Sequence, residues 1–162
     1  MNLLKLLNLI KLSIVVGVIG LSILCLLISL FLPVFNTADG GFFDGFSVMI
    51  VGWMAITFAN LGVGSLGWYA NPLLLIVWLG LALSKFRVGG FVALIVSIGI
   101  ALCSLLLVHK TVEVNEGGGT SEIVSIGMGF YVWLASFAIC IFGYLATIIV
   151  DRIHAKKNNT TG

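Results

Sequence analysis

The sequence predicts an all-α integral membrane protein, a bundle of four transmembrane helices with both termini in the cytoplasm. Three observations predict this class: the composition, four long apolar runs, and the sorting of the charges between those runs. Of the 162 residues, 60% are hydrophobic and 9% are charged, and the mean hydropathy is +1.24. Soluble domains carry about 25% charged residues. A soluble fold could not bury this much apolar surface.

The four apolar runs are each long enough to be read as a membrane span. About 20 apolar residues in a helix cross a hydrocarbon core about 30 Å thick. Little sequence is left for anything but two external loops, one tight internal turn and short tails, so residues 1–162 form a single membrane domain. The expected spans cover residues 12–32, 72–87, 88–108 and 126–150.

Charged residues sort by sign between the two ends of these spans. Seven of the eight lysines and arginines fall on the side of the two termini: Lys5, Lys11, Lys85, Arg87, Arg152, Lys156 and Lys157. Five of the six acids fall on the other side: Asp39, Asp44, Glu113, Glu116 and Glu122. The positive-inside rule therefore places both termini in the cytoplasm and the protein in an inner or plasma membrane. The basic residues suit anionic lipid rather than nucleic acid.

The first external loop is expected to contain a helix that does not cross the membrane. Residues 42–60 are largely apolar but too short to span untilted, which favours an interfacial or re-entrant segment. A fifth span is the alternative, and it would disturb the charge sorting. After this segment, Asn71 is expected to cap the second span, with Pro72 at the first helical position. At the far end of the chain, residues 155–162 are expected to be a disordered tail.

The second external loop has the pattern of a small β-hairpin. Residues 111–115 and 121–125 alternate apolar and polar side chains, and a glycine-rich turn separates them. The apolar side of this hairpin is expected to rest on the aromatic segment of the first loop.

A stripe of small residues marks the third span. Gly89, Ala93, Ser97 and Ala101 recur every four residues, which lets helix backbones approach closely in lipid. Packing within one bundle is the favoured interpretation, and an interface between copies of the chain is the alternative.

The sequence shows no arrangement of residues that is typical of a catalytic or metal-binding site. No Asp, Glu, Lys, Arg or His lies near the middle of a span, which argues against a proton relay. His109 and His154 lie at opposite ends and cannot share a metal. The three cysteines, Cys25, Cys103 and Cys140, all fall within spans and are expected to pack as small apolar residues. We therefore expect that the protein is not an enzyme and that it binds neither a metal nor a cofactor.

Aromatic and acidic residues gather on the external side and are the candidates for binding a partner. They are Asp39, Phe42, Phe43, Asp44, Trp53, Asn60, Trp68, Tyr69, Tyr131 and Trp133. The rings alternatively form an ordinary aromatic belt at the membrane surface, and the acids are alternatively solvated loop residues or ligands for a cation.

Two function classes remain. The first is a non-catalytic protein that binds a membrane protein or lipid, such as an accessory subunit or an immunity-type or exclusion-type protein. The second is an oligomeric channel or small transporter for a neutral or apolar solute.

Overall fold

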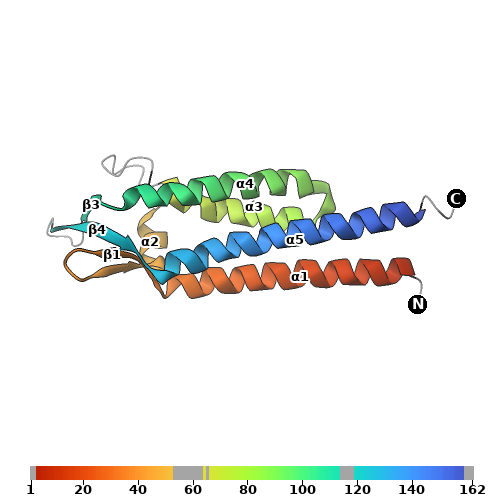
Figure 1. Cartoon of the computed structure of the whole chain (residues 1–162), viewed down its shortest axis with the longest axis horizontal. Coiled ribbons are helices and arrows are strands. Elements are labelled where there is room, and N and C mark those ends of the chain that lie inside the picture. Colours follow the sequence, from red (N-terminus) through yellow and green to blue (C-terminus); the bar gives the residue numbers. More distant parts are fainter. Residues whose placement is uncertain (1–2, 53–63, 65, 114–118, 159–162) are drawn as a thin grey trace.

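The computed structural model describes residues 3–52, 64, 66–113 and 119–158. These residues form a mostly helical molecule with a small antiparallel sheet at one end (Figure 1). The start of α1, the turn between α3 and α4, and the end of α5 lie together at the opposite end. This arrangement separates a basic helical end from an end built by the two predicted external loops.

Four helices lie side by side along the long axis of the molecule. Helix α1 packs mainly along α5, and α3 packs mainly along α4 (Figure 1). Two short 3-10 turns extend α4, one at each end. The bounds are α1 Leu3–Leu30, α3 Ala70–Ala82, η2 Ser84–Phe86, α4 Arg87–Cys103, η3 Ser104–Leu107 and α5 Met128–Asn158.

Among the described residues, three helical segments are long and apolar enough to cross a membrane: Lys5–Leu30, Ser84–Leu107 and Met128–Lys156. A further segment, Leu66–Ala82, is apolar but shorter. The prediction of a mostly helical chain with apolar segments of spanning length is therefore confirmed for three segments, and the fourth span stays a prediction.

Several predicted boundaries need correction. Helix α1 begins at Leu3 rather than near residue 12, because the leucine-rich segment before Lys11 continues the helix at little cost. At the other terminus, the prediction of a disordered tail is wrong for residues 155–158, which belong to α5. Residues 159–162 lie outside the described part of the chain.

The start of α3 also differs from the prediction. The helix begins at Ala70 with Tyr69 as its N-cap, so Asn71 lies one position inside the helix and does not cap it. Its side chain instead accepts a hydrogen bond from Trp133 on α5. The Asn71 amide, which was predicted to cap the helix, therefore makes a tertiary contact instead.

The sheet has four antiparallel strands in the order β2-β1-β4-β3. The predicted hairpin of the second loop is confirmed by the pairing of β3 with β4. The first loop supplies β1 and β2, which were not predicted, so the all-α class is incomplete. The bounds are β1 Pro33–Thr37, β2 Phe42–Asp44, β3 Thr111–Glu113 and β4 Thr120–Ile126.

A short helix, α2 (Gly45–Gly52), follows β2 directly. It accounts for the helical part of the segment expected at residues 42–60, while residues 42–44 are strand. Residues 53–60 lie outside the described residues, so the choice between an interfacial, a re-entrant and a spanning segment stays a prediction.

Two apolar clusters hold the fold together. The larger lies between the helices and buries Leu74, Val77, Leu94, Phe137 and Tyr144 almost completely. The smaller lies under the sheet and contains Val34, Phe35, Ile123 and Phe130. The sheet end therefore has a core of its own, joined to the bundle through the first turns of α5.

The small-residue stripe of α4 is buried at Ala93, Ser97 and Ala101. Gly89 does not belong to this packed face, since it is exposed and has no neighbouring side chain within reach of an added Cβ. Gly90 lies there instead, directly against Gly80 of α3. The backbones of α3 and α4 therefore meet at a glycine one residue further along than the spacing predicts.

A buried polar cluster centres on Ser22 of α1. Its hydroxyl donates to the carbonyl of Ser136 at 2.9 Å and accepts from the indole N–H of Trp78 at 3.0 Å. The thiol of Cys140 lies 3.4 Å from the same oxygen. Polar groups in an apolar medium need such partners, so this cluster fixes α1, α3 and α5 relative to one another.

Candidate functional site

The sheet presents a row of residues that crosses three strands. Asn36 on β1 pairs with Phe42 on β2 and with Ser125 on β4, and its amide donates to the Ser125 hydroxyl at 2.9 Å. Phe42 is 60% exposed, and Val124 beside Ser125 is 43% exposed. We call Asn36, Phe42, Val124 and Ser125 the sheet patch. It combines two exposed apolar side chains with an amide and a hydroxyl that are held in place.

Asp39 ties the first loop to the second. Its Oδ1 accepts a hydrogen bond from the Ser121 hydroxyl of β4 at 3.0 Å, and the neighbouring Ala38 N–H donates to the Glu122 carbonyl at 2.9 Å. Hydrogen bonds from the side chains of Thr37 and then Ser121 lower the pKa of the Asp39 carboxyl below its ordinary value. Asp39 is therefore ionised at neutral pH and joins the β1–β2 turn to β4.

Asp44 caps helix α2. It immediately precedes the helix, and its Oδ1 accepts the backbone N–H of Ser47 at 2.7 Å, the bond that an N-cap side chain makes. The hydrogen bond from the Ser47 side chain, followed by this backbone bond, lowers the pKa of Asp44. The carboxylate satisfies a helix N–H that has no partner within the helix.

Replacing Asp44 with alanine is expected to reduce the free energy of unfolding by about 1 kcal/mol, the usual cost of losing a cap, whereas Asp44→Asn retains most of it. Because the folded-state pKa is lowered, the ionised cap contributes fully above the ordinary carboxyl pKa of about 4. The contribution is lost as the pH falls through the lowered folded value. Thermal unfolding in detergent at pH 7 and pH 3 measures both effects. Equal losses for alanine and asparagine at pH 7 would contradict the capping role.

Glu122, another of the external acids, is paired with His109. The His109 Nδ1 lies 2.9 Å from the Glu122 Oε1, and the backbone N–H of His109 donates to the Ile123 carbonyl at 2.7 Å. His109 has a positive φ of 66°, a left-handed conformation that turns the chain from η3 into β3. These contacts hold β4 against the turn that follows η3.

The external acids do not gather into a metal site in the described part of the chain, where no three His, Cys, Asp or Glu side chains lie close enough to hold an ion. Asp39, Asp44 and Glu122 each have a protein partner instead. The side chain of Glu113 and all of Glu116 lie outside the described residues.

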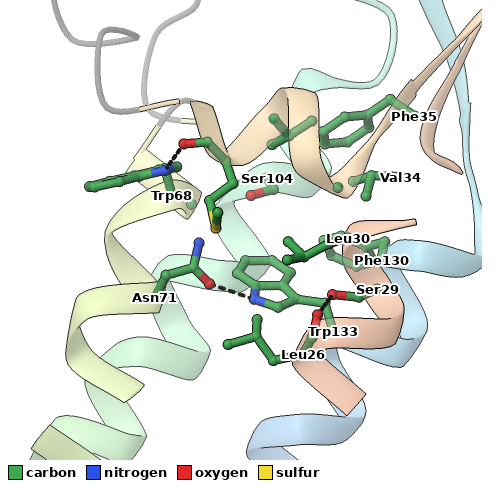
Figure 2. Close-up of a pocket in the computed structure, with 14 residues that line it drawn as sticks. Leu26, Ser29, Leu30, Val34, Phe35, Trp68, Asn71, Ser104, Phe130 and Trp133 are labelled. Atoms are coloured by element: carbon green, nitrogen blue, oxygen red, sulfur yellow. Dashed lines mark hydrogen bonds between the residues drawn. The ribbon is translucent and has the colours of Figure 1, made fainter. Parts of the chain in front are cut away.

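A cavity of about 50 Å³ lies where the sheet end meets the bundle (Figure 2). The indole of Trp133 enters from α5, and its N–H donates to the Asn71 Oδ1 at 2.8 Å. On the opposite wall, the indole N–H of Trp68 donates to the carbonyl of Met49 at 2.7 Å. That carbonyl is in the last turn of α2, where helix carbonyls have no partner within the helix. Trp68 therefore holds the end of α2 against the start of the α3 segment.

These contacts divide the predicted partner-binding residues into two groups. Phe42 and Tyr131 are 60% and 57% exposed. Four rings are half-buried: Phe43, Trp68, Tyr69 and Trp133. Phe43 and Trp133 pack against the smaller apolar cluster, and Trp68 and Tyr69 pack against each other. Asp39 has its partner on β4 of the second loop, Asp44 caps α2 within its own loop, and Trp53 and Asn60 lie outside the described residues. The exposed rings are available to a partner, whereas the half-buried rings position the elements that carry them.

The opposite end of the molecule contains an ion cluster that the sequence analysis missed. Asp151 of α5 accepts from the Lys11 Nζ of α1 at 2.7 Å and from the Arg87 guanidinium at the start of α4. The three side chains are 34%, 26% and 19% exposed. One signal was present in the sequence, because Asp151 is the single acid among the basic residues of that end.

No protein-family model matches this chain, and neither a curated protein nor a solved structure matches it.

Proposed function

We propose that this chain is a non-catalytic, four-span cell-membrane protein that binds a membrane protein or a lipid through the sheet patch. In this proposal the sheet is extracytoplasmic, and both termini are cytoplasmic. The role is that of an accessory subunit or of an immunity-type or exclusion-type protein.

The observation that carries the proposal is the joining of the two loops into one sheet. Connections between neighbouring helices need only about 2–8 residues, yet residues 33–52 and 111–126 build four strands and a helix with a separate core. This core holds Phe42 and Val124 on the exposed side, where they do not stabilise the bundle. An ordered surface with exposed apolar side chains suits recognition of another molecule.

Charge and helix length support the topology. The start of α1, the α3–α4 turn and the end of α5 lie at one end, and they carry the basic residues that the positive-inside rule retains in the cytoplasm. The segment Leu66–Ala82 extends for about 25 Å at 1.5 Å per residue. Lys85, which follows it, can extend its ammonium to the lipid phosphates and so help this shorter segment to cross.

The channel alternative is less well supported. The space between the helices is filled by Leu74, Phe137 and Tyr144, each 0–1% exposed. A pore for a neutral solute would therefore have to form between copies of the chain.

The proposal is tested by cross-linking from outside intact cells. After Cys25, Cys103 and Cys140 are replaced with alanine, a single cysteine is placed at Val124 in the sheet patch or, as the matched control, at Val88 at the basic end. Val88 is 79% exposed. Whether the reagent reaches a cysteine at this position therefore depends on which side of the membrane the position faces. A membrane-impermeant reagent with a maleimide at one end and a photoactivatable diazirine, which reacts without a thiol, at the other is expected to join the Val124→Cys chain to a partner and to leave Val88→Cys unlabelled.

A second substitution tests the patch itself. Phe42→Ser in the Val124→Cys background is expected to reduce the cross-linked product at least about fivefold while leaving maleimide labelling unchanged. Labelling of Val88→Cys from outside would overturn the topology. If liposomes containing the purified protein transport solute and Phe42→Ser leaves the cross-linked product unchanged, the channel replaces our proposal.

A further inference from the structure

A second cavity, of about 200 Å³, lies at the basic end beside the α3–α4 turn. One part of its wall is polar and the other is apolar. The polar residues are Asn8, Lys11, Ser84 and Arg87, and the apolar residues are Leu12, Val15, Leu81 and Ala82. This cavity is at the opposite end of the molecule from the sheet patch.

The cavity has an excess of positive charge. Lys11 and Arg87 share one carboxylate, that of Asp151, so the cluster has a net charge of +1. The Nε and Nη2 atoms of Arg87 are shielded from solvent and have no hydrogen-bond partner among the described residues. Leaving charged donors unpaired in a buried position is costly. An anion bound in the cavity, which Lys11 and Arg87 both line, would offset this excess positive charge.

We propose that this cavity binds the phosphate group of an anionic phospholipid. A guanidinium presents parallel N–H groups that match two oxygens of a phosphate, and a lysine adds a point charge. Arg87 also begins α4, where the helix dipole favours an anion. The cluster therefore supplies the positive charge that a phosphate diester needs, at a cavity lined by both cations.

The walls favour a lipid over free phosphate. Leu12 is 59% exposed on the surface of α1, and Val16 beyond it is 62% exposed, so an acyl chain leaving the cavity has an apolar path along the helix. The cavity also lies between α1 and the end of α3, which belong to different helix pairs of the bundle. A lipid in this position would contact both pairs. The proposal is independent of the partner-binding function.

The experiment uses the purified full-length protein in mild detergent and native mass spectrometry. Dioleoylphosphatidylglycerol is compared with dioleoylphosphatidylcholine, which carries the same acyl chains and the same phosphate diester. The choline ammonium is disfavoured beside a positively charged cluster. We expect the phosphatidylglycerol complex to be at least about tenfold more abundant at equal lipid concentration, since charge-assisted bonds of this kind have about this effect. Thermal unfolding with millimolar inorganic phosphate tests the free anion.

Two variants test the cavity, and one variant is the control. Arg87→Gln is expected to reduce phosphatidylglycerol binding about tenfold or more. Ala82→Leu fills the apolar wall without changing a charge, and it is expected to reduce binding even if Arg87→Gln does not fold. Arg152→Gln removes an exposed charge from the position next to Asp151 that does not line the cavity, and it should change binding less than about twofold.

Equal binding of the two lipids, or equal losses for Arg152→Gln and Arg87→Gln, would overturn the proposal. A gain in thermal stability with inorganic phosphate that is as large as the gain with phosphatidylglycerol would also overturn the lipid assignment. Loss of phosphatidylglycerol binding in Arg87→Gln and Ala82→Leu, with no effect of inorganic phosphate, is the supporting result.

Discussion

Replacing Gly90 with leucine is expected to prevent α3 and α4 from packing and to leave little folded protein in mild detergent. A Cβ added at Gly90 would lie 2.6 Å from the Cα of Gly80 and would also clash with the Tyr144 hydroxyl. The Gly80 contact is with backbone, so relief requires the helices to separate. Overpacking a core costs about 1–3 kcal/mol when side chains can adjust, and we expect about 3 kcal/mol or more where they cannot. Size-exclusion chromatography and thermal unfolding measure the effect.

The matched control is Gly89→Leu, at the neighbouring position. Gly89 is exposed, and an added Cβ meets nothing within 4 Å. Leucine is also favoured over glycine in a helix by roughly 0.5–1 kcal/mol. This variant should therefore be at least as stable as the original chain. Similar losses for the two variants would show that α3 and α4 do not meet at Gly90.

Removing the carboxylate of Asp151 is expected to have the second largest effect. In Asp151→Ala, Lys11 and Arg87 lose the acceptor that they share and are left as two neighbouring positive charges. Breaking a fully buried ion pair costs about 3–5 kcal/mol. Because these side chains retain 19–34% exposure, solvent screening reduces the expected loss to about 1–3 kcal/mol. Denaturant unfolding in detergent micelles measures it.

A double-mutant cycle separates repulsion from lost packing. If the remaining cations repel each other, adding Lys11→Met to Asp151→Ala should recover part of the stability, and the coupling free energy should be about 0.5 kcal/mol or more. Arg152→Ala removes an exposed charge from the adjacent position and should change stability by less than about 0.5 kcal/mol. No recovery in the double variant would mean that Asp151 acts through packing alone.

The helical part of the fold was predictable because its signals are local. Hydropathy identified the three apolar segments, and alternation with a glycine-rich turn identified the β3–β4 hairpin. Strand β1 could not be found in this way. Phe35 pairs with Ile126, which lies in the other loop, and no local pattern at residues 33–37 reports a partner so distant in sequence.

The aromatic residues of the candidate site could be listed from the sequence. Which of them are exposed and which pack inside the fold could not be predicted. Phe42 is exposed and Phe43 is half-buried, although the two residues are adjacent in the sequence. The pairing of β2 decides which of them faces solvent. Trp133 was expected at a binding surface, yet its indole N–H is bonded to Asn71. Rings of the same chemistry are therefore exposed or packed inside according to contacts made across the fold.

Composition and charge order by themselves determined that this chain is mostly helical, with segments apolar enough to cross a membrane and with a basic end and an acidic end, since hydrophobicity and charge act on each residue wherever its neighbours lie. Only the tertiary structure decided that both loops share one sheet, that Gly90 rather than Gly89 meets Gly80, and that Asp151 lies between Lys11 and Arg87. Those features depend on the rotation and axial position of packed helices. A shift of one residue turns a side chain by about 100° around its helix, which is enough to exchange a buried contact for an exposed surface.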